Sequence, residues 1–355
     1  MASSKDARHR TDTTWSEQAL TCCIYIPDDL IINILQRLPV KTLLRFKTVS
    51  KRWLSLISDP SFVYSHLRHA SENNESLIFN IKRYYHYKYS IALRHIDSTV
   101  DLPYFEGELL RDLYIIGSSN GIVCLVKNYR ADLVSYRNHL HRASGIYETR
   151  SLNLQIYLWN PATKKSKLLP PPHCLVTNFA FEQVGFGFDP LVNDYKVVMC
   201  HYHLNRDTCA VVYSTNANAW KEIERPKIYP QLSVCDACVN GVLYWSSYHC
   251  VMLYDLNKEV FYDHRFPANV LRTSGGKLLC VRIMEMKDSI AVITYTNDVA
   301  RLQSKVNLWT VDDGFERSWT LRYSFDVASA VDGIHNYLNN NGDILLRTRD
   351  GGWYN

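Results

Sequence analysis

The sequence contains no long hydrophobic run, and this absence argues against membrane-spanning helices. In 355 residues no apolar stretch reaches the roughly 18 residues that a membrane-spanning helix requires. Residues 1–20 are polar and lack the apolar core of a secretory signal. We therefore expect the ten cysteines to stay reduced, without disulfides, in the cytoplasm and also in the nucleus.

Catalytic signatures are missing as well. The chain has no H-E-x-x-H zinc motif, no P-loop and no G-x-S-x-G nucleophile elbow. Gly185 and Gly187 lack the third glycine of a dinucleotide-binding fingerprint, so their segment fits a strand instead. We therefore predict no catalytic residues and no cofactor.

Two groups of metal-ligand residue types are present, but neither has the spacing of a known metal site. A single C-x-x-C pair at 235–238 lacks the second pair of a zinc site. Cys200, His201, His203 and Cys209 form a denser group, in which the two histidines would share one strand face. Because ligand type alone does not define a geometry, we predict ordinary reduced cysteines and no metal.

The positive charge of the chain is small and local. The net charge is +5; residues 1–70 hold ten Lys and Arg against six Asp and Glu, and the rest holds thirty against twenty-nine. Nucleic-acid binding normally needs a basic stripe on the binding domain, so we predict no nucleic-acid partner. Basic and aromatic residues alternate over 83–89 and could stack bases, but a half-exposed strand explains the same alternation. A basic N-terminal module suits an acidic protein partner.

Helical periodicity is the first positive signal. Apolar residues recur at helical spacing over 30–38, between Pro27, which suits a helix start, and Pro39, which forces a stop. Shorter periodic segments follow at 43–46 and 49–57. The spacing predicts three short helices near the N-terminus.

From about residue 76, strand-like runs replace this spacing. Asn-Gly is the strongest short hairpin signal, and it precedes a strand-like run at 120–121, 240–241 and 341–342. A second repeat is an aromatic strand end followed by a turn, at 159–163, 213–216, 254–257 and 309–312. The chain therefore contains an internally repeated β architecture.

The repeat spacing predicts a mainly β fold with a small α domain. Half of each Asn-Gly interval gives blades of roughly 50 to 60 residues, near the kelch period, and hence a kelch-like β-propeller of about six blades. A β-sandwich is the alternative, but its turns recur at roughly 8 to 12 residues. The last blade opens at 342–346 and stops before four strands, and we expect a strand at 76–81 to close it. We place a mobile tail at 1–23, the helical domain at 24–68 and the β domain at 77–355.

The segment from Ile26 to Trp53 resembles the F-box motif over nearly its whole length. The resemblance implies binding to a Skp-type adaptor, which links to the cullin scaffold of a ubiquitin ligase. A domain of about 40 residues is marginal alone, which agrees with a face completed by a partner, although an ordinary small helical core is the alternative. The positions that match adaptor-facing or supporting residues are Pro27, Ile34, Leu35, Leu38, Pro39, Leu43, Leu44, Val49 and Trp53.

The rest of the chain resembles plant F-box proteins with a type-1 F-box-associated domain, through matches at 117–125, 158–163, 168–170, 184–190 and 194–198. The resemblance implies that this domain holds the protein to be ubiquitylated, and that the chemistry belongs to recruited enzymes. The sequence is also similar to pollen S-locus F-box proteins, which implies self-incompatibility with S-ribonuclease as the target. The alternatives are an F-box protein acting outside a ligase and a kelch-type propeller enzyme.

The segment 127–150 is longer and more basic than the hairpin loop that it interrupts. Long loops on rigid scaffolds often carry recognition, although a solvated insertion fits the composition equally well. We predict that this loop contacts the target protein through Arg130, Arg137, His139, His141 and Arg142.

Overall fold

The chain divides into two compact units, Met1–Phe62 and Val63–Asn355, and each is considered by itself. The computed structural model describes a helical segment, three short strand pieces and most of the β region. The described residues are 26–72, 80–81, 91–92, 99–100, 113–127, 154–172, 179–203, 208–226, 235–247, 250–266, 279–286, 289–298, 303–311, 319–329, 331–338, 344–348 and 353–354. The predicted tail at 1–23 lies outside these residues.

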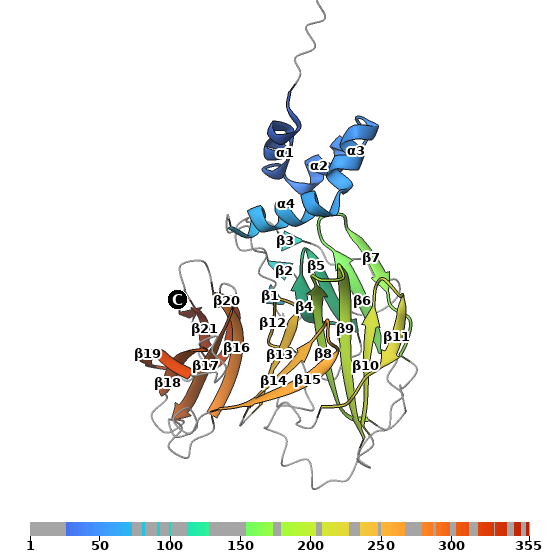
Figure 1. Ribbon diagram of the computed structural model, residues 1–355. Coiled ribbons are helices and arrows are strands. Elements are labelled where there is room, and N and C mark those ends of the chain that lie inside the picture. The colour runs from blue at the N-terminus through green and yellow to red at the C-terminus, as the bar shows by residue number, and fades with distance from the viewer. Residues whose placement is uncertain are drawn as a thin grey trace, which may run out of the picture. The chain divides into compact units, whose positions relative to one another are not determined.

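Four helices are present where three were predicted: α1 (Asp28–Gln36), α2 (Val40–Phe46), α3 (Lys51–Ser58) and α4 (Pro60–Glu72) (Figure 1). The additional helix begins at Pro60, directly after Asp59, whose Oδ1 accepts a hydrogen bond from the Ser61 backbone N–H at 2.8 Å. Phe62 then anchors α4, since its side chain is buried in the helical core. Among the described residues, no helix is long and apolar enough to span a membrane.

The boundaries of α1 and α3 differ from the prediction by one or two residues. Pro27 lies just before α1 as its N-cap residue, and Asp28 and Asp29 occupy the first turn. Val49 lies outside α3, although the periodicity included it in the third helix. The reason is Ser50, whose hydroxyl accepts a hydrogen bond from the Trp53 backbone N–H at 3.2 Å and so starts α3 after Val49.

Four antiparallel sheets of four strands each form most of the described β structure of the second unit. The first contains β4 (Leu113–Ser119), β5 (Ile122–Lys127), β6 (Gln155–Asn160) and β7 (Lys165–Leu168). The second contains β8 (Phe179–Asp189), β9 (Asp194–His203), β10 (Thr208–Ser214) and β11 (Ala219–Glu222). The third contains β12 (Ala237–Val239), β13 (Val242–Ser246), β14 (Cys250–Asp255) and β15 (Val260–Arg265). The fourth contains β16 (Leu279–Met286), β17 (Ser289–Asp298), β18 (Gln303–Val311) and β19 (Trp319–Val327).

Two three-stranded sheets complete the described β structure. One contains β1 (Asn80–Ile81), β2 (Ile91–Ala92) and β3 (Thr99–Val100), and the other contains β20 (Val331–Leu338), β21 (Ile344–Thr348) and β22 (Trp353–Tyr354). The expectation that 76–81 closes the last blade is wrong for its described part, because Asn80 and Ile81 pair with β2. Pairing with a neighbour close in sequence costs less loop-closure entropy than pairing across the whole domain.

The Asn-Gly pairs form the predicted hairpin turns. Asn120 and Gly121 have φ values of 45° and 75°, and Asn240 and Gly241 have 49° and 75°. Positive φ at both central residues is the geometry that selects Asn-Gly in two-residue hairpins. The third pair, 341–342, lies outside the described residues, between β20 and β21, which pair antiparallel.

The repeated aromatic residues occupy equivalent places in the four complete blades. Each lies on the third strand, just before the turn to the fourth, and each is almost fully buried: Trp159, Tyr213, Tyr254 and Trp309. The second sequence repeat is therefore a packing repeat, with one large aromatic side chain for each blade.

The sheets follow one another in series, as in a propeller. β4 contacts β8, β8 contacts β12 and β13, β12 contacts β16, and β16 contacts β20, so the first strand of each sheet approaches the first strand of the next. Hydrophobic clusters join successive sheets, for example Phe186 with Leu158, and Trp245 with Val198. A sandwich of two sheets is thereby excluded, and the propeller-like prediction is confirmed.

Gly185 on β8 sets how closely two blades approach. A Cβ at Gly185 would lie 2.5 Å from Trp245 Cζ2 and 2.9 Å from Leu243 Cδ1, both on β13. A Cβ at Gly187 would meet Cys238 in the same way. The paired glycines therefore serve close packing between blades, in agreement with the strand interpretation of this segment.

Candidate functional site: the exposed apolar face of the helices

The helical core is small and accounts for two of the nine predicted adaptor-binding residues. Leu35 and Leu43, which are 1% and 4% exposed, pack with Ile57 and Phe62. Side chains buried this deeply cannot contact a partner while the helices stay folded. Leu35 and Leu43 therefore support the face and do not form it.

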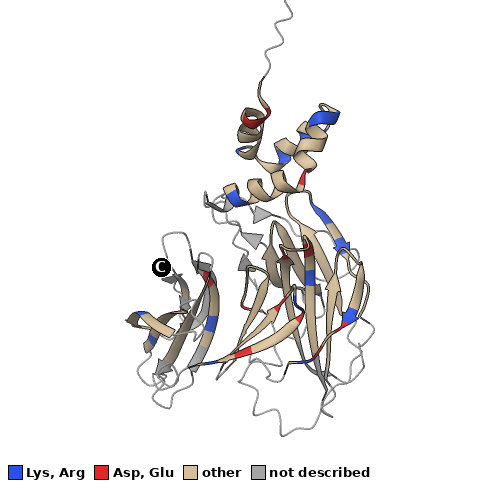
Figure 2. Ribbon diagram, in the orientation of Figure 1, with Lys and Arg blue, Asp and Glu red and all other residues tan. Residues whose placement is uncertain are grey.

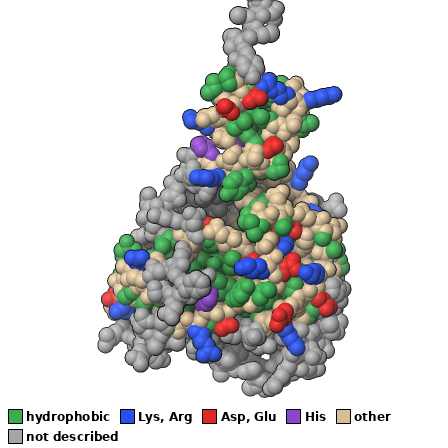
Figure 3. Space-filling model, in the orientation of Figure 1, with side chains coloured by type: hydrophobic (Ala, Val, Ile, Leu, Met, Phe, Trp, Pro, Cys, Tyr) green, Lys and Arg blue, Asp and Glu red, His purple; other side chains and the backbone are tan. Residues whose placement is uncertain are grey.

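Five other predicted residues lie on the surface. Ile34 on α1 is 56% exposed, and Val49 in the α2–α3 connection is 64% exposed. Pro27, Pro39 and Leu44 are also exposed. In Figure 3, hydrophobic side chains are visible over the helices between charged ones. Apolar side chains at such a density on so small a unit are typical of a surface that a partner covers.

Leu38 and Trp53 are half-buried, so each belongs partly to the helical core and partly to the exposed surface. Both pack against the helical core. The Trp53 ring meets the Phe46 ring edge to face, with 4.9 Å between centroids and an interplanar angle of 70°. Trp53 therefore joins α2 to α3 while part of its ring remains accessible.

Four further exposed apolar residues were missed by the motif match. Leu30 precedes Ile34 by four residues on α1, and Val40 precedes Leu44 by four on α2, so each extends an exposed stripe along its helix. The others are Ile26 and Leu54, and all four are exposed. The (i, i+4) spacing in the sequence is the signal that would have identified Leu30 and Val40.

Charged residues lie on the same helices. Figure 2 shows residues of both signs on the helices. Arg52 on α3 forms an ion pair with Asp28 at the start of α1, with both side chains more than half exposed. An exposed pair of this kind contributes little stability.

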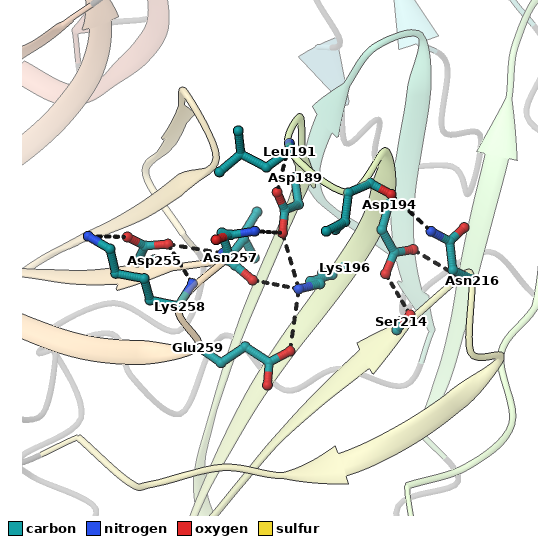
Figure 4. Close-up of polar contacts among 12 residues, drawn as sticks. Asp189, Leu191, Asp194, Lys196, Ser214, Asn216, Asp255, Asn257, Lys258 and Glu259 are labelled. Atoms are coloured by element: carbon teal, nitrogen blue, oxygen red, sulfur yellow. Dashed lines mark hydrogen bonds and ion pairs between the residues drawn. The ribbon is translucent and has the colours of Figure 1, made fainter. Parts of the chain in front are cut away.

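A second polar cluster lies between two blades and is structural (Figure 4). Lys196 Nζ on β9 donates to the Leu256 carbonyl at 2.6 Å and lies 3.2 Å from Asp189 Oδ2 and 3.3 Å from Glu259 Oε1. Leu256 and Glu259 belong to the β14–β15 turn of the next blade. The buried ammonium therefore joins the β8–β11 blade to the β12–β15 blade.

Glu259 in this cluster stays ionised. Its partial burial alone would raise its pKa, but the hydrogen bond from Lys221 and the charge of Lys196 outweigh that effect and lower the pKa below the ordinary value. Lys221 Nζ lies 2.6 Å from Glu259 Oε2. A carboxylate held between two ammonium groups is a weak base, and its contacts join the two blades.

Asp194 anchors a separate turn within the β8–β11 blade. Its Oδ1 accepts hydrogen bonds from Thr215 Oγ1 at 2.6 Å and from the Asn216 backbone N–H at 3.0 Å, and Ser214 Oγ donates to its Oδ2 at 2.5 Å. The carboxylate thus accepts the hydrogen bonds of the polar groups at the start of the β10–β11 turn. Its acceptor positions serve the fold.

The C-x-x-C thiols are poor metal ligands and poor nucleophiles here. Burial raises the pKa of Cys238 to about 12 and that of Cys235 well above its ordinary value. Cys235 Sγ donates to the Ala237 carbonyl at 3.0 Å. Protonated thiols of this kind agree with the interpretation of Cys235 and Cys238 as ordinary reduced cysteines. The side chains of His201 and His203 lie outside what the structure describes, so the second group stays untested.

The predicted target-binding residues, Arg130, Arg137, His139, His141 and Arg142, lie outside the described residues, as does the aromatic segment 83–89. The connectivity still determines where the loop leaves its blade. Successive turns of an antiparallel meander alternate between two ends of the sheet. The β5–β6 connection therefore leaves from the end opposite the Asn120-Gly121 turn.

The described residues thus form two parts, a helical module with exposed apolar side chains and a propeller-like domain. A family model for the F-box associated beta propeller domain (FBA_3) matches residues 113–346, and a model for the F-box domain matches residues 25–65. The chain therefore belongs to the F-box associated beta propeller family, with an F-box in front of that domain.

Known relatives agree with this assignment. The F-box protein At2g21930 of Arabidopsis thaliana is 27% identical over 341 residues, which cover 89% of this chain and 77% of that one. The F-box/kelch-repeat protein At3g23880 of the same plant is 28% identical over 321 residues, covering 83% and 78%. Among solved structures, AofleA from Arthrobotrys oligospora aligns over 68% of this chain and 67% of that one, with 9% identity and a TM-score of 0.37, which is too low to support an argument.

Proposed function

We propose that this chain is a substrate-recognition subunit of a Skp-cullin-F-box ubiquitin ligase. The helices bind a Skp-type adaptor, the adaptor links to a cullin scaffold, and the propeller-like domain binds the protein to be ubiquitylated. The subunit itself is non-catalytic and acts by bringing the target to recruited enzymes. It works in the cytoplasm and also in the nucleus.

The exposed apolar face of the F-box carries this proposal. Ile34 and Val49 are more than half exposed although both are large and apolar, while Leu35 and Leu43 keep the helices folded beneath them. Covering such a face with a partner removes apolar area from water, which is favourable by roughly 25 cal/mol per Å². The family match to the F-box makes a Skp-type adaptor the partner.

A narrower form of the proposal rests on the sequence resemblance alone. In that form the chain acts in pollen self-incompatibility and its target is an S-ribonuclease. Co-purification of an S-ribonuclease with the propeller-like domain would support it, and capture of unrelated proteins only would reject it.

The test measures the affinity of the adaptor for the full chain with Ile34→Ala and Val49→Ala together, compared with the unmodified chain. Both side chains are exposed, so their truncation spares the helical core. Loss of two apolar contacts at an interface is expected to weaken binding at least tenfold, which corresponds to about 1.4 kcal/mol. Surface plasmon resonance against purified adaptor gives the dissociation constants of the unmodified chain and of the double variant.

The matched control is Leu191→Ala, which truncates an exposed apolar side chain on the β8–β9 turn. This variant should bind the adaptor like the unmodified chain. Equal adaptor affinity for the double variant and the control would contradict the assignment. Co-purification of a cullin with the unmodified chain separates a ligase subunit from an F-box protein that acts outside a ligase.

A further inference from the structure

The outer strand β19 differs from the other outer strands of the four complete blades. β7 and β11 have four residues each and β15 has six, whereas β19 has nine. Within the described sheets each of these strands has a neighbour on one side only. Proteins usually keep such edges short and charged, because an open edge pairs with other chains. β19 therefore presents the longest open edge of the four.

The edge of β19 is also the most apolar. All side chains from Leu321 to Asp326 are exposed, with Tyr323 at 66% and Phe325 at 39%. Residues 323–327 pair in unbroken register with residues 304–308 of β18, and the only shift in this pairing lies at Leu308/Trp309, beside Arg322. The exposed stretch is therefore a regular strand up to Tyr323, where the bulge begins.

The sequence of this edge is complementary to itself. When two copies of β19 pair antiparallel about Ser324, Tyr323 lies opposite Phe325 of the second copy, and Arg322, which follows at the bulge, comes next to Asp326 of the second copy. The two-fold symmetry repeats both pairs. Opposite charges and aromatic pairs directly across two strands each contribute roughly 0.2–1 kcal/mol.

The charges also select this register. Centring the pair on Arg322 would place two guanidinium groups opposite each other, and centring it on Asp326 would oppose two carboxylates, which is destabilising. Centring it on Tyr323 would place Arg322 opposite Ser324 and Asp326 opposite Thr320, and centring it on Phe325 would place Asp326 opposite Ser324 and Arg322 opposite Ala328, so neither register pairs the charges. The register about Ser324 alone pairs charges of opposite sign and aromatic with aromatic.

We propose that the chain forms a symmetric dimer by antiparallel pairing of β19 with β19 of a second copy, centred on Ser324. The contact is isologous, so it closes on itself and forms no fibre. A single strand pair buries less than the roughly 1,000 Å² of a stable interface, so we expect weak association, with a dissociation constant on the order of 100 µM. The dimer joins two recognition subunits, which favours targets with two binding segments by effective concentration.

Sedimentation velocity of the full-length chain from about 1 to 300 µM tests the pairing. The unmodified chain should move from monomer to dimer over this range. Arg322→Asp alone opposes two carboxylates and Asp326→Arg alone opposes two guanidinium groups, so each variant should stay monomeric. An equal mixture of these two variants restores both charge pairs and should recover the dimer.

The matched control is Tyr262→Lys, which replaces an exposed aromatic residue on the shorter outer strand β15 and should dimerise like the unmodified chain. Arg322 Nε donates to Thr310 Oγ1 at 2.8 Å, so Arg322→Asp also loses a hydrogen bond within its own chain. Tyr323→Lys at its exposed site supplies an independent variant, which must also be monomeric. A monomeric unmodified chain, dimeric single-charge variants or a monomeric mixture would each overturn the proposal.

Discussion

Gly185 shows how a missing side chain holds two blades together. Its Cα faces the Trp245 indole and Leu243 of the next blade at a distance that leaves no room for a methyl group. Well-packed interiors do not absorb added atoms without shifts of backbone or rotamer. The same sequence pattern suggested a strand, but the reason for two glycines became visible only with the neighbouring blade in place.

Replacing Gly185 by Ala should destabilise the propeller by about 1–3 kcal/mol, the usual cost of overpacking. The added Cβ would lie 2.5 Å from Trp245 Cζ2, so the indole or the strand must move. Urea unfolding of the full-length chain, followed by tryptophan fluorescence, measures the change in the free energy of unfolding.

Gly117→Ala is the matched control, because a Cβ there would meet only the Phe186 carbonyl oxygen at 3.8 Å. That variant should unfold close to the unmodified chain. If both alanine variants unfold at the same urea concentration as the unmodified chain, the packing argument for Gly185 is wrong.

At the scale of elements, turns provide the polar contacts between blades. The β14–β15 turn supplies the Leu256 carbonyl and the Glu259 carboxylate to Lys196 of the preceding blade. Asp189, at the end of β8, completes the environment of the ammonium. Removing one member of a buried ion pair leaves the other charge buried without compensation, which usually costs more than the pair contributes.

Lys196→Met should therefore lower the free energy of unfolding by about 3 kcal/mol or more. Lys196 is only 7% exposed in its side chain, whereas Lys258, which pairs with Asp255 over three residues, is 67% exposed. Lys258→Met is the control and should change stability by less than about 1 kcal/mol.

A double variant, Lys196→Met with Asp189→Asn, separates charge from packing. Removing both charges should cost less than the sum of the two single changes, because the buried Asp189 carboxylate is no longer left facing an apolar side chain. Additive costs in calorimetric or urea unfolding would show that the ion pair is not coupled.

The elements themselves were largely predictable where local chemistry decides them. Asn120-Gly121 predicts its hairpin because only a few residues accept positive φ, and Pro39 separates two helices because proline cannot continue the first. The start of α3 was misplaced because the periodicity of apolar residues outweighed the capping signal of Ser50. The pairing of Asn80 with β2 depends on competition between distant partners, which no local pattern records.

The site was predictable to a smaller extent. The motif match found Ile34 and Val49 but could not separate them from Leu35 and Leu43, because exposure depends on how the helices pack. Leu30 and Leu54 are absent from the predicted adaptor-binding residues, because neither is among the positions that were matched to the F-box motif. Sequence similarity therefore predicted which helices carry the surface, and the structure determines which of their side chains are exposed.

At the scale of the whole molecule, the proposed function assigns recruitment and recognition to separate compact units. The exposed apolar face lies on the F-box, and the basic segment 127–150 belongs to the β5–β6 connection of the propeller-like domain. Charge on such a loop governs encounter rate and partner choice more than the stability of the fold. Changing it should alter which proteins are captured without changing adaptor affinity.

The double change Arg137→Glu and Arg142→Glu tests this separation. The tested chains also carry Ile34→Ala and Val49→Ala, so that captured proteins are not passed to the ligase. Proximity labelling should recover a different set of proteins from the charge-reversed loop, while the same loop change in an otherwise unmodified chain leaves adaptor binding intact. The matched control is Lys164→Glu with Lys165→Glu, the same change of charge at exposed residues of the β6–β7 turn and β7. The control should capture the original set, because the proposal assigns recognition to the loop and not to the total charge. Identical protein sets from loop and control variants would return segment 127–150 to the class of solvated insertions.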